Sequence, residues 1–269
     1  MRIPFVMLAA TAITLGALAP ASAETPTIEE AQRLFYNGRY QAAAEATADG
    51  CVTETVDLAA CELRTSALLF QIKRAFGEPA DKDKAWPLCA VCQELMPTFL
   101  ADIAKGQVAA RAKLMAAPSD TDALFMLGKL DLNYVWLQLG TLGRKTGWSE
   151  YWEARKSLDK VLKQDPAHIR ARVARAWIDY IVGARVPRGT RWLLGGGNKK
   201  KGVSAVREAA TIEGDPFSRA EAGFALWDMQ VREKDIGGAV STARGLAYDF
   251  PDNEELRKFL ALHDTPAGR

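Results

Sequence analysis

Histidine is scarce in this chain of 269 residues, which holds only His168 and His263. Many metal centres and acid–base catalytic sites contain histidine, so two histidines exclude most kinds of histidine-based site. A large charge of one sign is also missing, since 35 lysine and arginine residues stand against 33 aspartate and glutamate residues. The resulting net charge of +2 argues against a dedicated nucleic-acid binder, which normally carries a large basic excess.

Low-complexity sequence is missing as well. Glycine (21 residues) and proline (12 residues) occur at ordinary frequency, and 48% of the chain is hydrophobic, as in a globular domain. The motifs G-x-S-x-G, H-E-x-x-H and C-x-x-C-H do not occur. We therefore expect a protein that is not an enzyme, with no catalytic residue, no metal and no cofactor.

The first 23 residues have the pattern of a secretory signal peptide. Arg2 supplies the positive start, residues 3–18 are largely apolar, and Ala21-Ser22-Ala23 is a small-residue cleavage site. A membrane anchor is the alternative, but the apolar stretch is short for a span of ~20 residues and Pro20 follows it. We predict cleavage after Ala23 and a periplasmic protein with no membrane span after signal removal.

Four cysteines remain in the exported chain, where the environment is oxidising. Of the three pairings we favour Cys51 with Cys61, which flank a short polar loop, and Cys89 with Cys92, which share one face of a predicted helix. A redox role for Cys89 and Cys92 and a zinc site made from all four cysteines remain as alternatives. No strand pattern precedes the C-x-x-C motif, and the spacing is unlike that of a zinc ribbon.

Helical periodicity dominates after residue 24, and alternation with period 2 is nearly absent. The pattern predicts helices over 29–36, 42–48, 58–76, 85–116, 121–142, 149–163, 167–183, 199–212, 217–232, 237–248 and 253–262. Pro97 should kink the helix over 85–116 or mark a boundary in it. The sequence thus predicts one all-α domain over 24–263, followed by a flexible tail over 264–269.

Several of these segments resemble tetratricopeptide repeats. The sequence from Asn37 to Ala43 (NGRYQAA) resembles the family's turn and second-helix start. Leu226, Ala239 and Pro251 fall at the family's spacing for its first-helix leucine, second-helix alanine and closing proline, although Trp227 replaces a small residue. The resemblance implies a helical-repeat solenoid, here with elongated helix pairs and a C-terminal capping helix over 253–262.

A second resemblance concerns Leu193 to Lys201 (LLGGGNKKK), which is similar to a stretch of the periplasmic T component of TRAP-type transporters. That family implies a scaffold that meets a substrate-binding partner and offers apolar ligands a path. Helical-repeat proteins of bacterial envelope lipid or sterol transport are a related class.

Stacked helix pairs leave a concave surface on which such proteins usually bind their partners. We expect aromatic side chains to anchor a partner or ligand there. These candidates are Tyr134, Trp136, Trp148, Tyr151, Trp152, Trp177, Tyr180 and Trp192. Most of them also suit a role in the core, and we expect Trp148 and Trp192 to be partly exposed because they lie in connections longer than the repeat requires.

Residues 185–201 hold six positive residues and no acidic one, which indicates a patch for an anionic partner. These six are Arg185, Arg188, Arg191, Lys199, Lys200 and Lys201. Gly195 to Gly197, just before a helix, could present backbone N–H groups to a phosphate. The alternative interpretation is a solvated loop and helix end.

Two functions follow from this sequence. The first is a non-enzymatic scaffold that docks a protein partner of an envelope transport system. The second is a carrier of a lipid, sterol or other apolar small molecule in a cavity between the helices.

Overall fold

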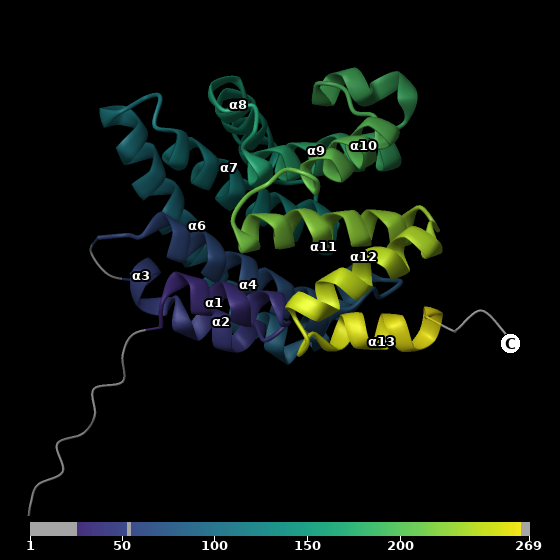
Figure 1. Cartoon of the computed structure of the whole chain (residues 1–269). Helices are drawn as coiled ribbons and strands as arrows, with labels where there is room; N and C mark the ends of the chain where they lie inside the picture. The colour runs from purple at the N-terminus through teal and green to yellow at the C-terminus, as the bar shows by residue number, and fades with distance from the viewer. Residues whose placement is uncertain (1–25, 53–54, 265–269) are drawn as a thin grey trace, which may run out of the picture.

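The computed structural model describes residues 26–52 and 55–264 (Figure 1). The predicted signal peptide and all but the first residue of the predicted tail lie outside the described residues. Every regular element in the described ranges is helical, which confirms the all-α class. In the same ranges, no helix is both long enough and apolar enough to cross a membrane.

The helices follow the sequence pattern closely. Their bounds are α1 (Ile28–Tyr36), α2 (Tyr40–Ala46), α3 (Ala48–Val52), α4 (Leu58–Phe76), α5 (Lys82–Ala85), α6 (Ala90–Ala116), α7 (Thr121–Val135), α8 (Trp148–Gln164), α9 (Ile169–Arg185), α10 (Lys199–Ala209), α11 (Pro216–Arg232), α12 (Ile236–Asp249) and α13 (Glu254–His263). Three short helical segments differ from an α-helix in their turns. These are η1 (Trp86–Leu88) and η3 (Arg188–Leu194), with tighter 3-10 turns, and η2 (Trp136–Thr141), with wider π turns. Side-chain caps begin many of the helices, as Asp57 does for α4.

The predicted helix over 85–116 is the main difference between pattern and structure. It divides at Cys89, which has a non-helical backbone and begins α6 as its N-cap. Pro97 lies inside α6 instead of ending it. Proline leaves the carbonyl of residue i−4 without its helical partner, and here that residue, Gln93, lies on the exposed side, where water can solvate it.

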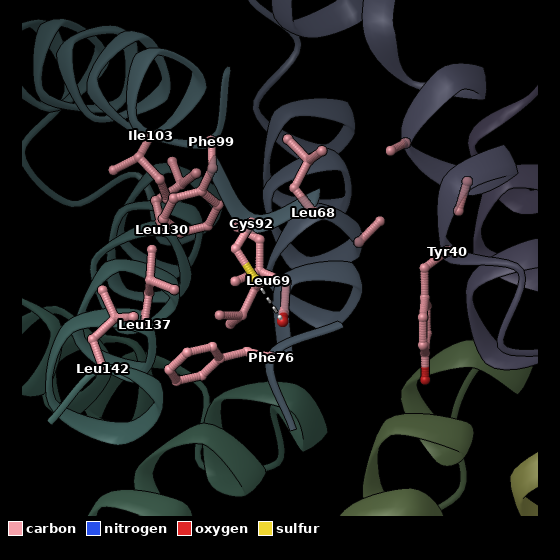
Figure 2. Packing of buried hydrophobic residues seen from close by; sticks show 14 residues of the cluster. Tyr40, Leu68, Leu69, Phe76, Cys92, Phe99, Ile103, Leu130, Leu137 and Leu142 are labelled. Carbon is pink, nitrogen blue, oxygen red and sulfur yellow. Dashed lines mark hydrogen bonds between the residues drawn. The ribbon is translucent and has the colours of Figure 1, made fainter. Parts of the chain in front are cut away.

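Consecutive helices pack against one another along the chain, and some helices also contact a helix further along. In this way α4 contacts α7, and α9 contacts α11. The largest apolar cluster lies between α2, α4, α6 and α7, and Figure 2 shows its side chains, including Tyr40, Leu69, Phe99 and Leu130. Burial of these large side chains removes apolar surface from water and holds the helices together.

The two ends of the described chain meet. The Tyr36 ring stacks on Phe217 and Phe224 of α11, and its backbone oxygen accepts a hydrogen bond of 2.7 Å from Asn253 Nδ2. Figure 1 shows α1 and α2 (purple) beside α12 and α13 (yellow). The helix α13 packs on α12, and its start contacts the N-terminal part through Asn253 with Tyr36 and Glu255 with Arg74. The tetratricopeptide-like solenoid and its capping helix stay predictions.

Both disulfides favoured from the sequence are present at bonding distance. Cys51 joins Cys61, and Cys89 joins Cys92, so no cysteine in the described chain is free. The first pair ties α3 to α4, and the second ties the N-cap of α6 to its first turn. Such pairing is typical of proteins that fold in an oxidising compartment.

The contact between the two ends can be tested with Asn253→Ser. Serine retains the cap of α13 but loses the bond to the Tyr36 carbonyl, so the free energy of unfolding should fall by about 1–3 kcal/mol. Asn198→Ser is the matched control, because Asn198 caps α10 and its side chain has no further bond within the described chain. Equal losses in urea denaturation would show that the end-to-end bond contributes nothing.

Candidate functional site

Three of the predicted aromatic residues are exposed on one region of the surface. Trp148 and Trp152 lie four residues apart on α8, hence on one helix face, and each is 43% exposed. Trp192 in η3 is 73% exposed, and the next residue, Leu193, is 53% exposed. The partial exposure predicted for Trp148 and Trp192 is therefore confirmed.

Hydrogen bonds hold η3 against α8. The Tyr151 hydroxyl donates to the Leu194 carbonyl at 2.8 Å, and Arg155 Nη2 donates to the Gly195 carbonyl at 2.6 Å. The exposed tryptophans are close sequence neighbours of these contacts: Trp152 follows Tyr151, and Trp192 lies two residues before Leu194. These bonds place the end of η3 against α8, the helix that carries Trp148 and Trp152.

The glycine run after η3 permits close packing, and two of its three N–H groups are already bonded. A Cβ atom on Gly197 would lie 2.5 Å from Val182 Cβ, so only glycine lets this segment approach α9. The N–H groups of Gly195 and Gly196 are already donated to the carbonyls of Trp192 and Arg191. The expectation that these N–H groups are free for a phosphate is therefore wrong.

The six predicted cations divide into two groups. Arg191 donates to the carbonyls of Gly183 and Val186 at the end of α9, and Lys199 forms an ion pair of 2.7 Å with Glu233. The other four side chains are exposed and have no ion-pair partner within the described part of the chain. They are Arg185, Arg188, Lys200 and Lys201.

We call the combined region the aromatic–basic surface. Its members are Trp148, Trp152, Trp192, Leu193, Arg185, Arg188, Lys200 and Lys201. A small hollow of about 240 Å³ adjoins it at α10 and is lined by Lys199, Lys200, Val203, Ser204, Arg207 and Glu233. Exposed aromatic rings beside unpaired cations can bind an apolar and anionic surface through burial and charge attraction.

The remaining predicted aromatic residues do not join this surface. Tyr151 and Tyr180 are buried, and the Tyr180 hydroxyl donates to Glu233 at 2.8 Å. Trp177 is half-buried against Tyr180, and Tyr134 and Trp136 pack against the main apolar clusters. These five side chains support the core, the alternative role considered for them.

A second uncovered surface runs along α6, one end of which reaches the upper-left edge of the molecule in Figure 1. We call it the α6 stripe: Pro97, Ala101, Ala104, Val108 and Met115, all exposed and spaced as one helix face. Val108 is 66% exposed and Met115 is 80% exposed. The sequence analysis did not identify this face. Apolar residues on two sides of one helix could have indicated that one of the sides remains uncovered.

Four charged side chains meet where α4, α7, α9 and α11 come together, and we call them the ion quartet. The Arg170 guanidinium contacts Glu221 at 2.5 Å and Glu62 at 2.9 Å. Lys129 Nζ lies 2.6 Å from Glu221 and 3.6 Å from Glu62. All four are largely buried, so ion pairs fill the space where these helices face one another.

The quartet shifts the pKa values of two of its members, Glu221 and Arg170. Burial alone would raise the pKa of Glu221, but Lys129 and Arg170 outweigh it and lower that pKa to about 2. Glu221 and Glu62 likewise hold the pKa of Arg170 above its ordinary value, against the effect of burial. The sequence analysis did not find this site, because its four members come from helices far apart in the chain.

Asp131 is a buried acid outside the quartet. Its Oδ1 accepts a hydrogen bond of 2.7 Å from Gln107, whereas its Oδ2 has no partner in the described structure. Burial, followed by the nearby charge of Glu153, raises the pKa of Asp131 to about 8. The carboxyl group is therefore protonated at neutral pH in the folded protein.

His168 acts as a helix cap, because its Nδ1 accepts a hydrogen bond of 3.2 Å from the Ala171 N–H at the start of α9. Burial lowers the pKa of its imidazole. Across residues 26–52 and 55–264, no three or more histidine, cysteine, aspartate or glutamate side chains form a group that could hold a metal ion.

Glu221→Gln tests the quartet. The change leaves Lys129 and Arg170 with too little negative charge in a buried site, so the free energy of unfolding should fall by about 3–5 kcal/mol. Glu208→Gln removes an exposed ion pair with Arg172 and should cost less than about 1 kcal/mol. Chemical denaturation of both variants provides the comparison, and similar losses would contradict the special role of the buried site.

Asp131→Asn tests the buried acid through the pH dependence of stability. The folded pKa of about 8 lies above the reference value of 3.8, so the native state binds more protons between these values and stability falls as pH rises through this range. The asparagine variant should lack this slope and be at least about 1 kcal/mol more stable at neutral pH. A parallel pH profile for both proteins, measured by urea denaturation, would contradict the shifted pKa.

Neither comparison with known proteins assigns a family to the chain. A scan against protein-family models finds no match, and a search of the curated proteins also finds none. The resemblance to tetratricopeptide repeats and to the transporter T component therefore remains a prediction from the sequence.

Proposed function

We propose that the chain is a non-enzymatic scaffold of the cell envelope that binds a protein partner of a transport system. The α6 stripe carries this proposal. It is an apolar face on a helix of 27 residues whose other side already packs against α4 and α7. Exposed apolar surface marks interaction sites on folded proteins, and Arg111 is the one exposed charge on this face, between Val108 and Met115.

The contact would use helix-in-groove chemistry. Alanines at 101 and 104 allow a partner's backbone to approach closely, while Val108 and Met115 supply side chains for the partner to bury. Only three charged residues, Glu94, Arg111 and Lys113, are exposed along the whole of α6. Arg111 is paired with Glu153 of α8, so it adds little repulsion to an apolar partner.

An exported location supports the envelope setting of this proposal. The predicted signal peptide gives a route out of the cytoplasm, and the two disulfides are of a kind that persists in oxidising compartments. A periplasmic chain of this type would meet the soluble and membrane-bound parts of envelope transport systems.

Two hollows of the described chain differ from the site that an apolar carrier needs. The larger, of about 600 Å³, is open to solvent and lies beside α1, with Glu30, Arg33, Arg39 and Asp252 among its lining residues. The smaller is the basic hollow at α10. A carrier binds an apolar ligand in an enclosed cavity with mostly apolar walls.

Photo-crosslinking in the producing cell tests the scaffold role. A photoreactive phenylalanine analogue replaces Val108 in the α6 stripe or, as the control, Tyr248, which is 88% exposed on α12. We expect a discrete cross-linked product from position 108 alone, and mass spectrometry should identify a component of a transport system.

Val108→Glu provides the second arm of this test. The exposed position should leave the free energy of unfolding within about 0.5 kcal/mol of the original, while the cross-link partner no longer co-purifies. Tyr248→Glu should retain the partner. An absent product at position 108, or equal products at both positions, would refute the proposal.

A further inference from the structure

The aromatic–basic surface leaves large apolar side chains in contact with water. Trp192 and Leu193 project from η3, although apolar side chains of this size are usually buried. The segment is not loosely attached, since Arg191 and Tyr151 fix it to α9 and α8. The fold therefore presents these two side chains outward in a defined position.

The charges around these side chains have one sign. Residues 185–201 contain no acid, and four of their cations have no ion-pair partner within the described chain. On α8, exposed Lys156 and Lys160 continue the spacing of Trp148 and Trp152 along the helix. The acids Glu153 and Asp159 of the same helix are paired with Arg111 and Arg175, and Glu150 lies between the two tryptophans. Such a concentration of cations would be complementary to a surface rich in negative charge.

The hollow at α10 adds a place for a small anionic group. Lys200 belongs both to this hollow and to the aromatic–basic surface, and Arg207 and Ser204 lie on the same side of α10. Lys199 neutralises the one acid in its lining, Glu233, through their ion pair. The remaining charge of the hollow is positive, and its volume of about 240 Å³ can admit a phosphate group.

We propose that the aromatic–basic surface rests on the headgroup layer of an anionic lipid bilayer. The three tryptophans and Leu193 would enter the interface, where amphipathic rings and short apolar wedges are stable. Arg185, Arg188, Lys200 and Lys201 would stay at the level of the lipid phosphates. Charge complementarity favours a bilayer as the occupant. The unpaired cations attract anionic headgroups, while tryptophan is stable at the bilayer interface.

This role is separate from the proposed partner contact on the α6 stripe. None of the residues of the aromatic–basic surface lies on α6, so each surface can be changed alone. A chain attached to a bilayer in this way would bring the α6 stripe close to membrane-bound transport components.

Vesicle flotation with the purified protein tests the proposal. We expect binding to phosphatidylcholine vesicles that contain about one third phosphatidylglycerol, and much weaker binding to vesicles of phosphatidylcholine alone. Raising sodium chloride from about 0.1 M to about 1 M shortens the screening length from about 10 Å to about 3 Å and should release the protein. Soluble inorganic phosphate, added as a competitor at constant ionic strength, distinguishes a bilayer requirement from capture of phosphate alone.

Two variants locate the contact. Arg188→Gln, Lys200→Gln and Lys201→Gln together should reduce binding at least tenfold, since each cation near an anionic bilayer contributes about fivefold. The matched control carries Arg39→Gln, Lys113→Gln and Arg257→Gln, which remove the same charge from exposed positions elsewhere. Trp192→Ser should weaken binding about tenfold, and Tyr248→Ser should not.

Several outcomes would overturn the proposal. These are equal binding to neutral and anionic vesicles, equal losses in the two triple variants, or unchanged binding by Trp192→Ser with a native circular dichroism spectrum. Recovery of an acidic protein by cross-linking from position 192, with no vesicle binding, would assign the surface to a protein instead. Val108→Glu should bind vesicles normally, so failure of the partner proposal and failure of this one are distinguishable.

Discussion

The ion quartet is the constraint on which the arrangement of the helices depends. Glu62, Lys129, Arg170 and Glu221 come from four different helices, and each charge is acceptable in a buried place only because the others are present. A buried ion pair adds little net stability over apolar residues of similar size, because desolvation offsets the attraction. The quartet instead specifies which helices pack together and in which register. A shift of one helix by a turn would leave a buried charge without a partner.

The helix pattern was largely predictable because its causes are local. Periodic apolar residues and caps lie within a few positions of the helices they define, and α4 has the predicted bounds of 58–76. The two cysteine pairs were favoured for the same local reason. The quartet was not predictable, because nothing near Glu62 in the sequence indicates that Arg170 lies opposite. The sequence predicted exposure of Trp148 and Trp192 but not the anchoring role of Arg191 or the packing role of the glycines.

The outer surface has two parts with different chemistry. The α6 stripe is apolar and almost without charge, whereas the aromatic–basic surface joins three tryptophans to cations that lack partners within the described chain. A single helical body can thus offer an apolar helix face to one kind of partner and a charged interface to another. This division explains why the average composition, with nearly balanced charge, carried little information about binding.

The meeting of α1 with α11–α13 has a consequence for how the chain acquires its structure. The bond between Asn253 and Tyr36 joins residues 217 positions apart, so the N-terminal helices cannot complete their native contacts until almost the entire polypeptide has emerged. The predicted export route would benefit from this delay, because the N-terminal helices would not fold completely before the rest of the chain has crossed the membrane. Loop closure over such a length is entropically costly and should make this contact one of the last to form.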